Sequence, residues 1–207
     1  MELMECITGR RSIRSFKREP VKDADILLAL EAATFAPSPY NCQPWKFAVI
    51  KGDQLKKQMA QIIETKLNKA LSKIGADDDI DILLSYSRFF AFFEKAPVVI
   101  AAFCRTVTSP LVGFLERAGV SPEELEYTSH SEIQGSAAAI QNMLLRLHEM
   151  GLGASWMTNP LIAARELESL LEVKKPWHLI AMIPVGLPAS IPPMPRRKKV
   201  SYIAKFR

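Results

Sequence analysis

The segment TGRRSIRSF, near the amino terminus, gathers three arginines around Ser12. Side chains of an extended backbone alternate between two faces, so Arg10, Ser12 and Arg14 are expected to share one face. Arg11 and Ile13 then face the other way. Guanidinium groups bind phosphate oxygens in pairs and a hydroxyl adds a neutral donor, so this spacing suits a phosphate monoester better than a long polyanion.

A second basic cluster, from Arg196 to Lys199, lies near the carboxyl terminus, although the net charge of the chain is only +5. Such clusters serve nucleic acid, anionic lipid or a small phosphate, and an isolated cluster is more often a solvated charged surface. The sequence holds no nucleic-acid recognition motif, and aromatic residues do not interleave with the arginines. We therefore expect no nucleic-acid partner.

The length and composition indicate one globular domain spanning residues 1–207. Hydrophobic residues make up 48% of the chain and charged residues 24%, which is ordinary for such a domain. No apolar run approaches the roughly 20 residues that cross a bilayer, and the amino terminus lacks the pattern of a secretory signal. We expect a cytoplasmic protein with no membrane partner.

The cysteines and histidines form no recognisable reactive site in the sequence. Cys6, Cys42 and Cys104 lie far apart and lack a second ligand at metal-binding spacing, so they are interpreted as buried free thiols. His148 lies on an apolar helical segment and is interpreted as a packing or surface residue. Neither a metal site nor a catalytic side chain is predicted.

The apolar pattern predicts both helices and strands. Gly9 and Gly151 are typical of helix ends, Asp23 is a candidate helix cap, and Ser121 with Glu124 matches a capping box. The nearly continuous apolar run at residues 97–104 indicates a strand that is buried on both faces. The predicted strands are 46–51, 97–104 and 177–188, and helices are predicted at 1–9, 54–73 and 133–150. A further helix is predicted to begin at Asp23 and to end before Pro37. Its apolar stripe consists of Ile26, Leu27, Leu30, Ala33 and Phe35.

Three other segments combine small, polar or aromatic residues. The loop APSPYNCQPW, residues 36–45, holds three prolines, which fix the backbone and suit either a rigid binding loop or a plain connector. GLGASWMTNP, residues 151–160, carries polar donors but lacks the spacing of a dinucleotide-binding glycine fingerprint. The aromatic-rich segment 80–94 suits a core helix or a lid over a flat ligand. The proline-rich end of the chain, from residue 189, is expected to run across another surface.

Four motifs in order resemble the FMN-dependent nitroreductase superfamily: RRSIRSF, APSPYNCQPWKFAVI, AAAIQNMLLRLHEMGLGASW, and LIAMIPVGLP followed by RRKK. The likeness covers nearly the whole chain. It implies an α+β, nitroreductase-like fold with a mixed central sheet surrounded by helices. It also implies an intertwined homodimer with two FMN sites at the subunit boundary.

The resemblance also assigns cofactor-binding residues. The flavin phosphate and ribityl chain are expected to contact Arg10, Arg11, Ser12 and Arg14, and the phosphate also Arg197 with Lys198. The flavin ring is expected to lie along Trp156, Met157, Thr158 and Asn159. The loop that the other subunit contributes to the flavin is expected to carry Pro37, Ser38, Asn41 and Gln43. MTNPL resembles the iodotyrosine deiodinase branch, and either Thr158 or Asn159 is expected to contact flavin N5.

The implied activity is that of an FMN-dependent NAD(P)H oxidoreductase. In the family's ping-pong cycle NADH or NADPH gives hydride to flavin N5, and a small electron-poor acceptor such as a nitroaromatic or quinone then receives the electrons. Two alternatives stay open: a reductive dehalogenase or flavin-modifying enzyme of the same superfamily, and a non-enzymatic flavin-binding regulator. Tyr86, Glu94 and Lys95 fall in the region of the deiodinase lid, about residues 76–95, but not in the order of that branch.

Overall fold

The computed structural model describes residues 1–73, 89–107, 110–126 and 130–207. Its centre is a four-stranded sheet in the order β1-β2-β4-β3. The strands are β1 (Trp45–Ile50), β2 (Val98–Arg105), β3 (Gly153–Ala154) and β4 (Trp177–Gly186). The three strands predicted from the sequence correspond to β1, β2 and β4, and the short β3 was not predicted.

Neighbouring strands of this sheet run antiparallel throughout. The parallel component of the expected mixed sheet is an isolated bridge between Ser12 and Ala154. Ile13 strengthens this bridge, because its backbone N–H donates to the Ala154 carbonyl at 2.9 Å. The arginine-rich segment therefore lies beside β3 at the edge of the sheet.

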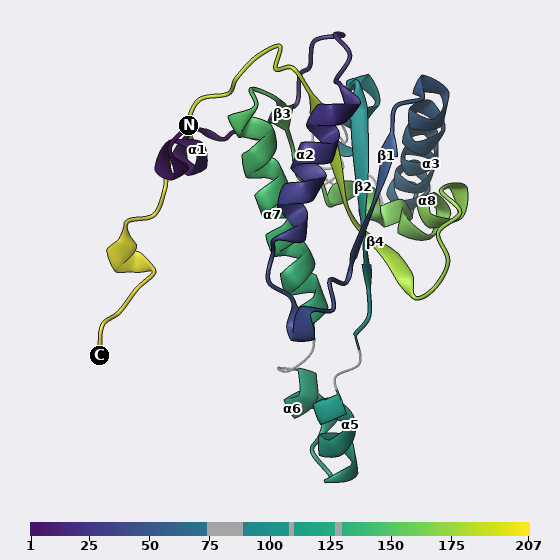
Figure 1. The fold of residues 1–207 in the computed structure, drawn as a ribbon. Helices are drawn as coiled ribbons and strands as arrows, with labels where there is room; N and C mark the ends of the chain where they lie inside the picture. The colour runs from purple at the N-terminus through teal and green to yellow at the C-terminus, as the bar shows by residue number, and fades with distance from the viewer. Residues whose placement is uncertain (74–88, 108–109, 127–129) are drawn as a thin grey trace.

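Helices cover both faces of the sheet (Figure 1). In the view of Figure 1, α2 and α7 lie on one side of the sheet and α3 and α8 on the other. The α+β fold expected from the sequence is confirmed. The helices are α1 (Leu3–Gly9), α2 (Asp23–Thr34), α3 (Asp53–Leu71), α5 (Pro110–Arg117), α6 (Pro122–Glu126), α7 (Ser131–Glu149) and α8 (Ala164–Leu170).

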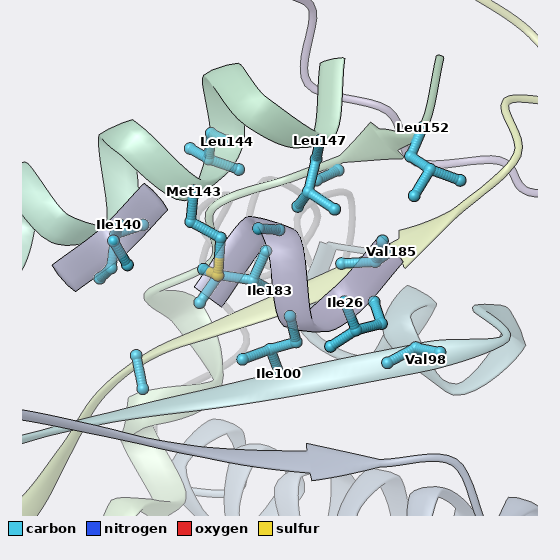
Figure 2. Close-up of a cluster of buried hydrophobic side chains, with 14 of the residues drawn as sticks. Ile26, Val98, Ile100, Ile140, Met143, Leu144, Leu147, Leu152, Ile183 and Val185 are labelled. Atoms are coloured by element: carbon cyan, nitrogen blue, oxygen red, sulfur yellow. The ribbon is translucent and has the colours of Figure 1, made fainter. Parts of the chain in front are cut away.

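The predicted burial of the 97–104 strand on both faces is confirmed. Val98 and Ile100 point into a cluster with α2 and α7, whereas Val99 and Phe103 point into a second cluster with α3 and α8. Figure 2 shows the first cluster, where Met143 of α7 lies above the β2 and β4 side chains. Apolar contact on both faces makes this sheet the rigid frame that carries the site.

The helix α7 packs its buried face against the sheet and α2. A Cβ atom on Gly135 would lie 3.1 Å from the Pro37 carbonyl oxygen, so the absence of a side chain lets the 36–45 loop approach the helix. Asn142 of α7 contacts α2, because its Nδ2 donates to the Ala32 carbonyl at 3.3 Å. Gly135 and Asn142 therefore hold the 36–45 loop and α2 against α7.

Two details of α2 differ from the sequence prediction. The cap residue is Lys22, and Asp23 is already helical. Ile26 and Ala33 are buried as predicted, but Leu27 is 65% exposed and Phe35 is 78% exposed. The buried face is narrower than the predicted stripe, because Leu27 lies about 100° around the helix from Ile26 and Phe35 lies beyond the last helical residue.

A buried lysine joins α3 to the start of β2. Lys56 Nζ donates to the carbonyl oxygens of Ala96 at 2.6 Å and Pro97 at 3.4 Å, and pairs with Asp53 at 2.9 Å. This hydrogen bond and charge hold the pKa of the Asp53 carboxyl below its usual value. The contact fixes the short 3₁₀ helix Phe92–Lys95 against α3.

The carboxyl-terminal segment starts on the arginine-rich segment and then leaves the body of the protein. Lys17 N–H donates to the Leu187 carbonyl at 2.9 Å, and Ala189 N–H donates to the Ser15 carbonyl at 3.0 Å. Beyond this pairing the chain passes α1 and ends in the open (Figure 1), with Tyr202 78% and Phe206 96% exposed. Across the described ranges, no helix combines the length and apolar character that a membrane span requires.

The contact between β3 and the arginine-rich segment can be tested at Gly153. A Cβ atom there would lie 2.7 to 2.9 Å from three side-chain atoms of Ile13, so Gly153→Ala forces the two segments apart. We expect the free energy of unfolding, measured with urea, to fall by about 1–3 kcal/mol. Gly113→Ala is the control, because its new Cβ meets only an ordinary contact at 3.8 Å. Equal stability of the two variants would contradict the tight packing described here.

Candidate functional site

The arginine-rich segment is extended and held on one side only. Arg10 follows the last residue of α1, Ser12 pairs with Ala154, and Ile13 is 4% exposed beneath β3. Ile13 points into the body of the protein as predicted, but Arg10 and Arg11, which were predicted on opposite faces, line one cavity together, and Arg14 lines another. Arg14, one position further, is exposed.

Arg11 is occupied by the end of α1. Its Nη1 donates to the carbonyl oxygens of Thr8 at 2.7 Å, Gly9 at 3.0 Å and Arg10 at 2.9 Å. These are carbonyls that a helix end leaves without an intrahelical partner. The Arg11 Nε atom is buried and, within the described parts of the chain, has no hydrogen-bond partner. Arg11 therefore anchors the segment, and its contact with a phosphate stays a prediction.

The carboxyl-terminal basic cluster acts electrostatically on Arg10. Burial of the Arg10 guanidinium, followed by the positive charges of Arg197 and Arg11, holds the pKa of Arg10 below its usual value. No carboxylate of the described residues forms an ion pair with Arg10 or Arg197. The fold thus brings like charges together and leaves them uncompensated, which is the electrostatic condition for binding an anion. Lys198 follows in the chain and is exposed.

A small cavity of about 220 Å³ opens beside these arginines. Arg10, Arg11 and His148 supply its basic groups. Burial, and then the charges of Arg10 and Arg11, lower the pKa of His148. Sequence reasoning treated His148 as a packing residue, because nothing along the chain shows that the end of α7 lies against the end of α1.

A second cavity, of about 350 Å³, lies around Arg14. The Arg14 Cζ atom is 5.6 Å from the centre of the Phe89 ring. The residues that line the cavity are Arg14, Phe89, Phe92, Ser155, Trp156, Met157, Thr158 and Asn159. All four predicted ring-contacting residues are therefore brought together with Arg14. Ser155, Phe89 and Phe92 were not assigned to the flavin from the sequence. The segment 80–94 was predicted to be a core helix or a lid, and its residues 80–88 lie outside the described ranges.

Exposure alternates along the segment after β3. Ser155 is 2% exposed, Trp156 is 37% exposed, and Met157 is 5% exposed. Met157 exchanges two backbone hydrogen bonds with Met182 of β4, at 2.9 and 3.0 Å. This pairing fixes the backbone that carries Trp156 and Thr158 at the cavity.

The 36–45 loop has a strained, internally bonded backbone. Tyr40, Asn41 and Gln43 all have positive φ angles, of 52°, 51° and 43°. The Ser38 hydroxyl accepts the Gln43 backbone N–H at 3.0 Å, and Gln43 Nε2 donates to Asn41 Oδ1 at 3.3 Å. Left-handed backbone at residues with a side chain is costly and concentrates at functional sites. This conformation favours the rigid binding loop over the plain connector.

The structure does not bring this loop to the two cavities. Ser38 lies against Gly135 in the first turns of α7, whereas the cavity beside Arg10 lies at His148 in its last turn. Thirteen residues of α-helix separate these positions, or roughly 20 Å at 1.5 Å per residue. Pro37, Ser38, Asn41 and Gln43 line neither cavity of their own chain, and their contribution to a second copy stays a prediction.

Other reactive groups do not converge in the described part of the chain. Its His, Cys, Asp and Glu residues form no group of three that could hold a metal ion. Burial raises the pKa of the Cys6 and Cys104 thiols, and a hydrogen bond joins Cys104 to Ser136 at 3.3 Å. Cys6 and Cys104 are buried free thiols as predicted, but Cys42 is half-buried.

Comparison with known proteins supports the same reading. The model of the Nitroreductase family matches residues 7–187. YfhC of Bacillus subtilis (strain 168), by name a candidate NAD(P)H nitroreductase, is 28% identical over 198 residues, which cover 96% of this chain and 90% of that protein. The iodotyrosine deiodinase of Thermotoga neapolitana is 27% identical over 207 residues, covering 99% and 97%.

One solved structure shares nearly the whole architecture. The crystal structure of a BluB-like flavoprotein from Clostridium difficile 630 matches with a TM-score of 0.93 and 32% identity, over 100% of this chain and 99% of that chain. The family match spans the arginine-rich segment, the cavity around Arg14 and the whole sheet. The resemblance carried by the sequence motifs is confirmed, and the chain belongs to the nitroreductase family.

Proposed function

We propose that the protein is an FMN-dependent NAD(P)H oxidoreductase that passes electrons to small electron-poor acceptors such as nitroaromatics or quinones. One observation carries this proposal: a single extended segment joins an uncompensated cationic cluster at Arg10 to a ring-sized cavity at Arg14. Four residues of extended chain span about 13 Å. This separation suits a phosphate and a flat ring joined by a five-carbon chain.

The residues at hand fit the phosphate of FMN. Arg10 and Arg197 repel each other, so a dianion between them removes an unfavourable term as well as adding charge-assisted hydrogen bonds. Ser12, in the middle of the segment, is half-buried and offers its hydroxyl to the chain between phosphate and ring. Lys198 adds positive charge at the mouth of the site.

The residues that line the cavity around Arg14 suit the flavin ring. Trp156, Thr158 and Asn159 line this cavity, and either Thr158 or Asn159 would hydrogen-bond flavin N5. A bound flavin supplies the redox chemistry, namely hydride uptake from NADH or NADPH and electron delivery to the acceptor. Arg14 contributes a fixed positive charge that stabilises the negative charge of the reduced ring. No protein nucleophile is needed for this reaction.

Space for an acceptor lies next to the ring cavity. Arg14 and Phe92 also line a larger cavity of about 650 Å³, which extends between α3 and the 89–95 segment. Phe90 and Leu67 give this cavity apolar walls. Apolar and aromatic walls beside the proposed flavin ring favour flat acceptors.

A second copy of the chain is needed to complete the site. The Ser38–Gln43 loop lies roughly 20 Å from the cavity at His148, by the length of α7 between them. Apolar side chains are exposed along α2 and the carboxyl-terminal segment, including Leu27, Ile191 and Phe206. Exposed apolar side chains of this kind are available to a protein interface. We infer a homodimer in which each loop reaches the flavin bound by the other chain.

Reductive dehalogenation is the second candidate function. It is favoured by MTNPL and by the 27% identity with the Thermotoga neapolitana iodotyrosine deiodinase over nearly the full length of both chains. The same site geometry serves both reactions, since the flavin and not a side chain reacts. The choice between them therefore rests on the acceptor.

Absorbance titration and turnover test the proposed function. We expect the protein to bind FMN, to bleach its visible absorbance on addition of NADH or NADPH, and to reduce nitrofurazone and menadione. Arg14→Leu should weaken FMN binding about 10- to 100-fold, the effect of losing a charge-assisted hydrogen bond. Arg165→Leu, at an exposed position of α8, is the control and should bind as the original protein does.

Protein that stays without flavin absorbance after incubation with FMN would rule the proposal out. Turnover with 3-iodotyrosine and none with nitrofurazone or menadione would favour the dehalogenase. Bound flavin that no donor reduces would indicate the flavin-binding regulator instead.

Subunit complementation tests the two-copy site. One chain carries Arg10→Ala and Arg14→Leu, and the other carries Ser38→Ala and Asn41→Ala. Each homodimer should lose FMN affinity. A heterodimer purified through two different tags should recover about half of the FMN sites, because one site then receives an intact segment and an intact loop. Recovery of none would show that segment and loop act within a single chain.

A further inference from the structure

We propose that His148 is a third basic group of the phosphate-binding cavity and that it takes up a proton when the phosphate of FMN binds. This inference rests on the proposed function and concerns a residue that the sequence motifs leave unassigned. It makes FMN affinity depend on pH through a side chain that lies at the end of α7.

The geometry places His148 against the same groups that would hold the phosphate. It lines the 220 Å³ cavity together with Arg10 and Arg11. A Cβ atom on Gly9 would lie 2.8 Å from His148 Nε2, so the imidazole packs directly on the last residue of α1. The Arg11 Nε atom, buried in this region, lacks a partner among the described residues. A cavity with three basic side chains and an unsatisfied buried donor is incomplete without an anion.

The surrounding charges support a link between proton and phosphate. Arg10 and Arg11 face His148 from the extended segment, and the amino-terminal residue Met1 also lines the cavity. On α7 itself, Glu149 follows His148 but is engaged by Arg146. Cys6 of α1 donates to the Leu145 carbonyl, and burial, with the charge of Glu149, keeps its thiol neutral by raising its pKa. The uncharged Pro188 and Ile191 close the cavity from the carboxyl-terminal side.

The sign of the effect follows from these charges. Without an anion, burial and the two arginines lower the pKa of His148 below its ordinary value of about 6.5, so the imidazole is neutral at pH 7. A phosphate dianion at Arg10 has the opposite effect and raises this pKa. Binding then takes up a proton, and FMN affinity increases as the pH falls through the interval between the two pKa values.

Calorimetry of the full-length protein tests this link at pH 7.5, where the phosphate, with a second pKa of about 6, is already dianionic. FMN is titrated into flavin-free protein in two buffers of different ionisation enthalpy. We expect uptake of a fraction of one proton per FMN by the original protein and none by His148→Gln. His178→Gln, a half-buried histidine on β4, is the control and should behave as the original protein.

The dissociation constant gives a second readout. From pH 8.5 to pH 7.0 the FMN dissociation constant of the original protein should fall by a larger factor than that of His148→Gln, because only the original protein has the imidazole that gains a proton on binding. Riboflavin, which lacks the phosphate, should show no such difference between the two proteins.

An NMR titration keeps the test valid if His148→Gln fails to fold. The chain has only three histidines, so their imidazole signals can be followed in the original protein with and without FMN. We expect one of them, His148, to titrate at higher pH when FMN is bound. FMN binding with no proton uptake and no shifted imidazole would overturn this inference and leave the proposed function intact. Failure of FMN to bind at all would overturn both.

Discussion

The site depends on keeping two arginines from opposite ends of the sequence close together without a carboxylate to neutralise them. Arg10 is fixed because Arg11 caps the end of α1 and Ile13 is packed beneath β3. Arg197 is brought near because the chain after β4 first pairs with residues 15–17. The positive charge of Arg197 adds to the burial of Arg10 in disfavouring its charged form. An anion bound beside Arg10 would favour that charged form again.

The central sheet and α7 set the distances within this site. Burial on both faces makes the sheet a fixed reference for β3, from which the Ser12 bridge and the Ser155–Thr158 backbone both extend. The helix α7 has the arginine cavity at one end and the strained 36–45 loop at the other. Its length keeps this loop away from the arginine cavity of its own chain. The left-handed residues of the loop therefore lie at the end of α7 that is away from the arginine cavity.

Features with local causes could be predicted from the sequence, and features with long-range causes could not. The capping box at Ser121 and the doubly buried strand at 98–105 follow from neighbouring residues, and both are present. The role of Arg11 could not be predicted, because the sequence does not show whether an arginine will bind the carbonyl groups of a helix end or a phosphate. His148 and Ser155 were missed because their environment arises only when α7 meets α1 and β3 meets β4. The candidate site itself was identified from family motifs, and charge spacing alone left its ligand open.

The most direct test of the central claim compares the affinities of FMN and riboflavin, which differ only in the phosphate, for the original protein and for Arg197→Ala. If the paired arginines hold the phosphate, the original protein prefers FMN by about 100-fold or more, and Arg197→Ala loses at least about tenfold of that preference while binding riboflavin unchanged. Equal affinity of the original protein for the two flavins would contradict the account.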